Sequence, residues 1–130
     1  MTRVLLAAAL VCALAPACAS AARYSFGRAG GNIEPFTISI TSNGAVYATG
    51  PVKVGRMSLT AAQLAAIARS VSAADFSTLP GTTLCLGTLP DFAASWISVG
   101  GRKVSVRGSC SPRFDRVWSA LAGAVRLSYG

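Results

Sequence analysis

The sequence predicts an α+β domain: an antiparallel sheet of two hairpins plus a first strand, two amphipathic helices packed on one face, and one disulfide. Three observations support this fold class. Asn43-Gly44 and Gly100-Gly101 each join two runs of alternating side chains, which is typical of hairpins. Two other segments place apolar residues at helical spacing. One pair of cysteines remains once an apolar leader is set aside.

Composition narrows the function before any motif is considered. The chain has 130 residues, of which 52% are hydrophobic and 12% charged, and its formal net charge is +8. This charged fraction is too low for charge-driven disorder. The chain contains no histidine, so it cannot by itself build a Ser-His-Asp triad, a His-ligated zinc site or a histidine pH switch. We therefore expect a protein that is not an enzyme and that binds no metal or cofactor.

Residues 1–21 are predicted to be a secretory signal peptide. Arg3 precedes an apolar run of 11 residues, Val4–Leu14, and a string of small residues follows. A membrane-spanning helix needs about 20 apolar residues, so this run is too short to be one.

The end of the leader allows more than one processing event. Cleavage after Ala21 and cleavage after Ala22 both fit the small residues found there. Acylation at Cys18 is the alternative, and only that event would tie the chain to a membrane. Residues 22–130 are then a single secreted α+β domain, located outside the cell or in the periplasm and cell envelope.

The cysteine count agrees with export. Cys12 and Cys18 belong to the leader, which leaves Cys85 and Cys110 as one pair in an oxidising compartment. We expect these two to form a disulfide. Closing the loop between them should stabilise the fold by roughly 3 kcal/mol.

The first part of the domain is predicted to form a strand and a hairpin. Residues 24–26 alternate in polarity, and the glycine-rich stretch 27–32 ends that strand. Residues 36–41 also alternate in polarity and are predicted to form a strand. After the Asn43-Gly44 turn, residues 46–49 are predicted to run back beside it as the second strand of a hairpin.

The register of this hairpin is open from sequence. A two-residue loop and a longer loop with a bulge at Gly44 both fit, and they differ in whether Val46 or Tyr47 faces Ile40. A short edge strand is expected to follow within residues 52–57.

A helix is predicted from about residue 61 to 72, because Thr60 and Gln63 stand at capping-box spacing before an apolar stripe. Residues 80–90 are expected to be a loop containing Cys85. The last helix should begin with Ser111 as its cap and Pro112 as its first residue.

The second hairpin joins residues 93–99 to residues 102–106. In the register set by Gly100-Gly101, Ile97 opposes Val104 on the core face. The other face is predicted to carry Trp96, Lys103, Ser105 and Arg107.

The excess of basic residues is the feature of the sequence that indicates a function. Five cations gather in the second hairpin and at the start of the last helix, and one tryptophan lies among them. Such a group binds an anionic partner through charge and a cation-π contact. The predicted site consists of Trp96, Arg102, Lys103, Arg107, Arg113 and Arg116.

The order of these features resembles small secreted bacterial proteins of unknown function. The shared features are a first strand ending in Gly30-Gly31, an Asn-Gly hairpin, a helix ending near Asp75-Phe76, a second hairpin and a final helix. The layout is also similar to that of the emfourin inhibitors of thermolysin-like metalloproteases. The resemblance implies a fold and inhibitory binding, and it supplies no functional residue.

Two functional hypotheses follow. In the first, the chain is a secreted non-catalytic binding module that acts on an extracellular protein, in the manner of a protease inhibitor. In the second, it is an envelope-associated structural domain held to an anionic surface by its basic face. Nucleic acid is not an expected partner of an exported protein.

Overall fold

A computed structural model describes residues 22–130 of the chain. The predicted signal peptide, the acylation alternative and the cysteines Cys12 and Cys18 lie outside the described residues. None of the helices formed by residues 22–130 is long and apolar enough to cross a membrane.

Strands and helices follow one another in an α+β order within this part of the chain. The elements are β1 (Ala22–Ala29), β2 (Phe36–Thr41), β3 (Val46–Thr49), β4 (Val52–Val54), α1 (Ala61–Ala73), the 3-10 turn η1 (Phe76–Thr78), β5 (Thr82–Leu84), β6 (Ala94–Val99), β7 (Arg102–Arg107), α2 (Pro112–Val125) and β8 (Leu127–Tyr129).

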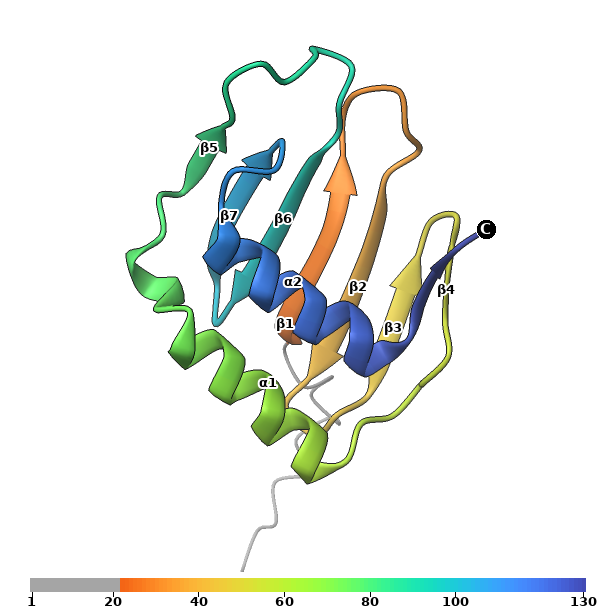
Figure 1. Ribbon diagram of the computed structural model, residues 1–130. Coiled ribbons are helices and arrows are strands. Elements are labelled where there is room, and N and C mark those ends of the chain that lie inside the picture. Colours follow the sequence, from red (N-terminus) through yellow and green to blue (C-terminus); the bar gives the residue numbers. More distant parts are fainter. Residues whose placement is uncertain (1–21) are drawn as a thin grey trace, which may run out of the picture.

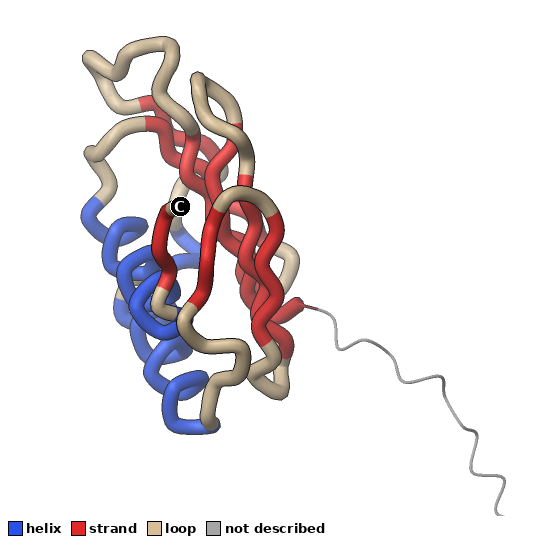
Figure 2. Tube along the Cα trace, turned by 90° about the vertical axis from the view of Figure 1, so that its right-hand side faces the viewer, coloured by secondary structure: helices blue, strands red, loops and turns tan. Residues whose placement is uncertain are grey.

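The main sheet has the strand order β3-β2-β1-β6-β7-β5, so β1 lies between the two hairpins. Both helices cover the same face of this sheet, and α2 crosses the central strands (Figure 1). Figure 2 shows that, within residues 22–130, no helix lies over the opposite face. The predicted α+β class and the Cys85–Cys110 disulfide are confirmed.

Alternation along the strands selects the side chains that enter the core. Phe26 pairs with Ile38 on one side and with Ile97 on the other, and all three are fully buried. The Phe26 ring meets the ring of Trp118 edge-on at a centroid distance of 5.3 Å, which joins the sheet to α2. Helix residues that complete the core are Ile67, Phe114, Val117, Leu121 and Val125.

The structure decides the register that the sequence left open. Ile40 pairs with Val46, and the amide of Thr41 donates to the carbonyl of Ala45. The turn therefore has three residues, and Gly44 takes a φ of 91° that favours glycine. The longer loop is the correct alternative, and it places Val46 in the core beside Ile40.

The second hairpin and the first helix form as predicted. Ile97 pairs with Val104 across a Gly100-Gly101 turn. The α1 capping box is complete, because Thr60 accepts from the Gln63 amide while the Gln63 side chain accepts from the Thr60 amide.

The start of α2 agrees with the prediction only in part. Ser111 occupies the N-cap position and Pro112 the first turn, but the Ser111 side chain makes no capping hydrogen bond. Its φ of −122° and ψ of 87° depart from the extended N-cap geometry seen at Thr60, so its hydroxyl does not reach the free amides of the first turn.

Three segments differ from the sequence prediction. β1 continues through Gly27 to Ala29, past the start of the glycine-rich stretch that was expected to end it, because it pairs with both β2 and β6 there. Within the predicted loop of residues 80–90, β5 forms a parallel edge strand beside β7, so the sheet is mixed. The Cys85–Cys110 disulfide holds this segment in place, together with a hydrogen bond from the Cys85 amide to the Arg107 carbonyl. The expected edge strand after residue 52 instead pairs with the C-terminal β8 in a separate small sheet.

Candidate functional site

The structure divides the predicted basic cluster among separate parts of the surface. Trp96, Lys103 and Arg107 lie on the sheet face opposite the helices, because they alternate along β6 and β7 with side chains that enter the core. We call these three residues the open-face cluster.

Trp96 and Lys103 are in direct contact. The Lys103 Nζ atom lies 4.8 Å from the centroid of the Trp96 ring, within the range of a cation-π interaction. The indole lies against Gly27 of β1, where a Cβ atom would stand 3.1 Å from the tryptophan ring. The Phe36 carbonyl oxygen would stand closer still, so glycine here is required mainly by the neighbouring strand.

Arg107 extends the cluster toward the loop end of the sheet. Its Nη2 atom lies near Gly30, and its Nε atom is buried without a hydrogen-bond partner among the described residues. The four carboxylates of the chain lie in loops or in α2. Charge on the strands of residues 22–130 is thus positive, which favours an anionic partner.

Arg102, Arg113 and Arg116 do not join the open-face cluster. Arg102 pairs with Val99 on the helix side of the sheet, and its Nη2 atom donates to the Leu79 carbonyl at 2.6 Å. Arg113 reaches the end of α1, where it donates to the Ala74 carbonyl at 3.3 Å.

These contacts give the arginines a structural task. The carbonyls near the end of a helix lack partners within that helix, and a guanidinium can supply the missing donors. Arg116 lies on the outer surface between α1 and α2, beside Ser70 and Ala73. The predicted site therefore keeps one tryptophan and two cations on one face.

A second candidate site lies at one end of the main sheet, beside the loops that follow β1 and β5. Figure 1 shows that the loop between β1 and β2 and the loop between β5 and β6 project from the same end. A half-open pocket of about 660 Å³ lies here. We call it the loop-end pocket, and its lining includes Arg28, Ile33, Leu86, Asp91, Phe92, Ser95 and the Cys85–Cys110 disulfide.

Large apolar side chains on these loops face solvent. Leu86 is 102% exposed and Phe92 54% exposed, although both lie in a well-anchored segment. Leu89 and Ile33 are exposed on the same two loops. Exposed apolar side chains that cluster beside a pocket mark an interaction surface.

Hydrogen bonds fix the loop that carries these side chains. The Thr88 Oγ1 atom donates to the Cys85 carbonyl at 2.7 Å, and the Asn32 amide donates to the Asp91 carbonyl at 3.1 Å. The neighbouring loop passes so close that a Cβ on Gly31 would stand 2.8 Å from the Ala93 nitrogen. The two loops are therefore ordered before any partner arrives.

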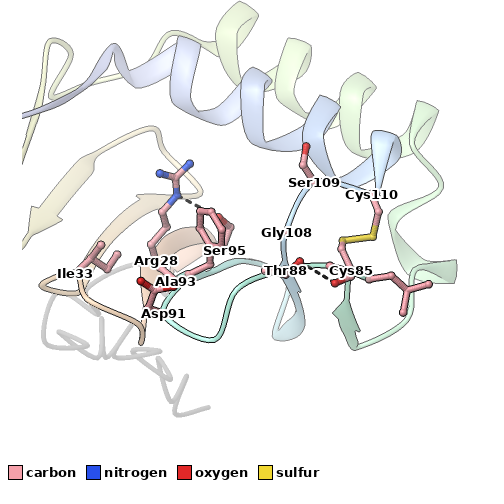
Figure 3. A pocket seen from close by; sticks show the side chains of 13 residues that line it. Arg28, Ile33, Cys85, Thr88, Asp91, Ala93, Ser95, Gly108, Ser109 and Cys110 are labelled. Atoms are coloured by element: carbon pink, nitrogen blue, oxygen red, sulfur yellow. Dashed lines mark hydrogen bonds between the residues drawn. A yellow bond between two sulfur atoms is a disulfide. The ribbon is translucent and has the colours of Figure 1, made fainter.

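Arg28 is the cation that lines the pocket, and Asp91 is the anion (Figure 3). Its Nε atom donates to the Ser95 Oγ atom at 3.1 Å. Its Cζ atom lies 5.2 Å from the Trp118 ring centroid and 5.4 Å from that of Tyr129. The guanidinium thus lies within cation-π distance of two aromatic rings at the edge of the pocket.

Sequence reasoning missed the loop-end pocket, although two signals for it exist. Arg28 follows Tyr24 and Phe26 at alternating positions, so a cation stands on the core-facing side of β1. Leu86, Leu89 and Phe92 are large apolar residues inside a segment that has no periodicity. Both patterns are unusual for residues that serve only the fold.

Both sites present groups suited to binding. The open-face cluster offers a cation paired with an aromatic ring, and the loop-end pocket offers a guanidinium within a mixed polar and apolar lining. Within residues 22–130, no three side chains among Cys, Asp and Glu come together as metal ligands. No model of a protein family, no curated protein and no solved structure matches this chain.

Proposed function

We propose that this chain is a secreted, non-catalytic binding module that docks on an extracellular protein through the loop-end pocket and the apolar side chains around it. The observation that carries the proposal is a set of solvent-facing apolar side chains on a loop that is already fixed. Each of its two halves, exposure and rigidity, contributes separately.

The exposure supplies the binding free energy. Each large apolar side chain that leaves water on docking contributes about 1.5 to 3 kcal/mol. Leu86 and Phe92 both line the pocket and are exposed, so a docked partner can cover them. Anchors that fill well-packed, desolvated pockets carry most of the binding free energy of protein interfaces.

The rigidity lowers the cost of association. Ordering a flexible loop on docking would consume part of the gain, whereas the disulfide at Cys85 and the bonds at Thr88 and Asp91 have ordered this loop already. A fixed, protruding loop is also what an inhibitor needs to occupy a protease without rearranging. Inhibition of a thermolysin-like protease, which the resemblance implies, is the specific form of docking that we propose.

The charge defines the partner. The chain carries twelve basic and four acidic residues, and the one cation lining the pocket is Arg28. A partner surface with apolar side chains next to carboxylates is complementary to this arrangement.

The test compares two pairs of exposed apolar residues. Leu86→Ser with Phe92→Ser removes the proposed anchors, and Tyr47→Ser with Met57→Ser removes two other large apolar side chains that are more than half exposed elsewhere. Proteins captured by the immobilised domain from the host's culture supernatant are identified by mass spectrometry, purified and titrated with each variant. The loop variant should bind at least about tenfold more weakly, and the control should bind like the natural domain.

Equal affinity of the loop variant and the natural domain for the purified partner would overturn the proposal. A weakening as large in the Tyr47 and Met57 control would also overturn it. The same proteins are assayed against thermolysin, and inhibition that is lost only in the loop variant supports the inhibitory form. Absence of inhibition at micromolar concentrations removes that form and leaves docking to be judged by the titration.

The open-face cluster supports a second candidate function, attachment to an anionic envelope surface. The Lys103–Trp96 contact and the nearby Arg107 present charge and a flat ring on one face. Retention on phosphatidylglycerol vesicles should fall as salt rises from about 0.05 to 0.5 M, because the screening length shrinks roughly threefold. Lys103→Ala with Arg107→Ala should abolish retention at low salt.

The matched control for that function is Lys53→Ala with Arg69→Ala, which removes the same charge from exposed positions away from the cluster. If both double variants lose retention equally, net charge alone explains the adsorption and the open-face cluster has no special role.

A further inference from the structure

Arg28 stands where the strand pattern calls for an apolar residue. It follows Phe26 on the core-facing side of β1, and it pairs with Ser95 of β6 and Phe36 of β2. A partly buried cation without a counter-charge is costly, because part of its hydration is lost and no opposite charge compensates for it. Among residues 22–130, Ser95 is the hydrogen-bond acceptor that the guanidinium has, and it forms no ion pair with a carboxylate.

The surroundings hold the guanidinium in one orientation. Trp118 and Tyr129 lie 5.2 and 5.4 Å from its Cζ atom, and the Ser95 bond occupies Nε. The Nη atoms are left as donors, with the fork geometry that matches two oxygen atoms of one acid group. A group fixed in this way loses little conformational freedom when an anion binds.

The lining selects among anions. The lining mixes polar and apolar residues; Ile33 and Phe92 are its large apolar side chains together with the fully exposed Leu86, so a ligand with an apolar body gains by entering. Asp91 also lines the pocket, with its Oδ2 atom 3.4 Å from the Asn32 Nδ2 atom. Its negative charge opposes a doubly charged phosphate more strongly than a singly charged carboxylate.

We propose that the loop-end pocket binds a side-chain carboxylate of an extended peptide segment, with Arg28 as its anchor and the apolar side chains of the lining taking the flanking residues. This inference rests on the proposed docking function and names the chemistry of the partner segment. The pocket is half open, so a chain can pass across it, and an internal acidic residue fits this shape better than a chain end. A C-terminal carboxylate is the competing source, and the experiment separates the two.

The probes are three short peptides, each acetylated at the N-terminus. One has the sequence leucine-glutamate-leucine and an amidated end, the second replaces glutamate by glutamine, and the third is the glutamine peptide with a free C-terminal carboxylate. Binding is followed by nuclear magnetic resonance on the Arg28 Nε–H and Trp118 indole N–H signals. We expect the glutamate peptide to move both signals and to bind about tenfold more tightly than the amidated glutamine peptide.

Variants of the chain test the role of the fork. Arg28→Lys keeps the charge but loses the bidentate geometry. It should lower the affinity for the glutamate peptide about fivefold and leave the affinity for the amidated glutamine peptide unchanged. Arg69→Gln removes an exposed cation from α1 and should have no effect. Asp91→Asn removes the opposing charge and should raise the affinity for the glutamate peptide. This measurement does not depend on whether any Arg28 variant folds.

Equal affinity for the glutamate peptide and its amidated glutamine analogue would overturn the inference. If the glutamine peptide with a free C-terminal carboxylate binds more tightly than the amidated glutamate peptide, the ligand is a chain end and not a side-chain carboxylate. Weaker binding of the glutamate peptide to Asp91→Asn would contradict the assigned electrostatics. In each of these cases the Leu86→Ser with Phe92→Ser variant still tests the docking function independently. Failure of the carboxylate inference can therefore be distinguished from failure of the docking proposal.

Discussion

Removing the disulfide should cost this domain a large part of its stability. The perturbation is Cys85→Ala with Cys110→Ala, and the bridge joins residues separated by 25 positions. The chain-entropy relation for a loop of that length gives an entropy of about 12 cal/mol/K, or about 3.5 kcal/mol at 25 °C. Cys85 is also buried at 6% exposure, so the loss of its sulfur contacts adds to this figure.

The assay is urea unfolding monitored by tryptophan fluorescence, which reports on both tryptophans, Trp96 on β6 and Trp118 in contact with Phe26. With a slope of about 1 to 2 kcal/mol/M, a loss of about 3.5 kcal/mol lowers the urea midpoint by roughly 1.8 to 3.5 M. Ser109→Ala, next to Cys110 and exposed, is the control and should leave the midpoint unchanged. A loss below about 1 kcal/mol would show that the bridge does not stabilise the fold by restricting the unfolded chain.

Three further predictions concern packing and caps. Gly108→Ala should lower the free energy of unfolding by about 2 kcal/mol or more, because the new Cβ would stand 2.6 Å from the Cys85 Cβ at a φ of +100°. Gly87→Ala shares a positive φ but has open space around it, so it should cost less, and equal losses in urea unfolding would refute the clash. Thr60→Ala removes half of the capping box and should cost about 1 kcal/mol in thermal unfolding, whereas no change would mean that the box adds nothing. Phe26→Ala empties a fully buried site and should cost about 3 to 5 kcal/mol, and a loss near 1 kcal/mol would contradict its central place in the core.

Features that depend on neighbours in the chain were predictable. The capping box at Thr60 needs only a partner three residues away, and the turn at Gly100-Gly101 needs only residues that accept a positive φ. The alternation of β6 and β7 then placed Trp96 and Lys103 on one face, so their contact also follows from local pattern. One part of the predicted basic site was therefore accessible from sequence.

Features that depend on distant partners were not predictable. β5 becomes a strand because the disulfide and β7 hold it, and β8 forms because β4 lies beside it. Arg113 was assigned to a binding face, yet it donates to the carbonyl of Ala74, which lies 39 positions away. Nothing in the local sequence distinguishes an arginine that donates to a distant carbonyl from one that remains exposed to solvent.

The sequence by itself determined the fold class, the disulfide pair, the alternating core positions and the positive charge, because each follows from residue type and short-range spacing. The tertiary structure alone decided the hairpin register at Gly44, the mixed sheet, the separation of the arginines and the loop-end pocket around Arg28. Each of these requires segments far apart in the chain to meet, and the free energy of such a meeting depends on the whole packed core.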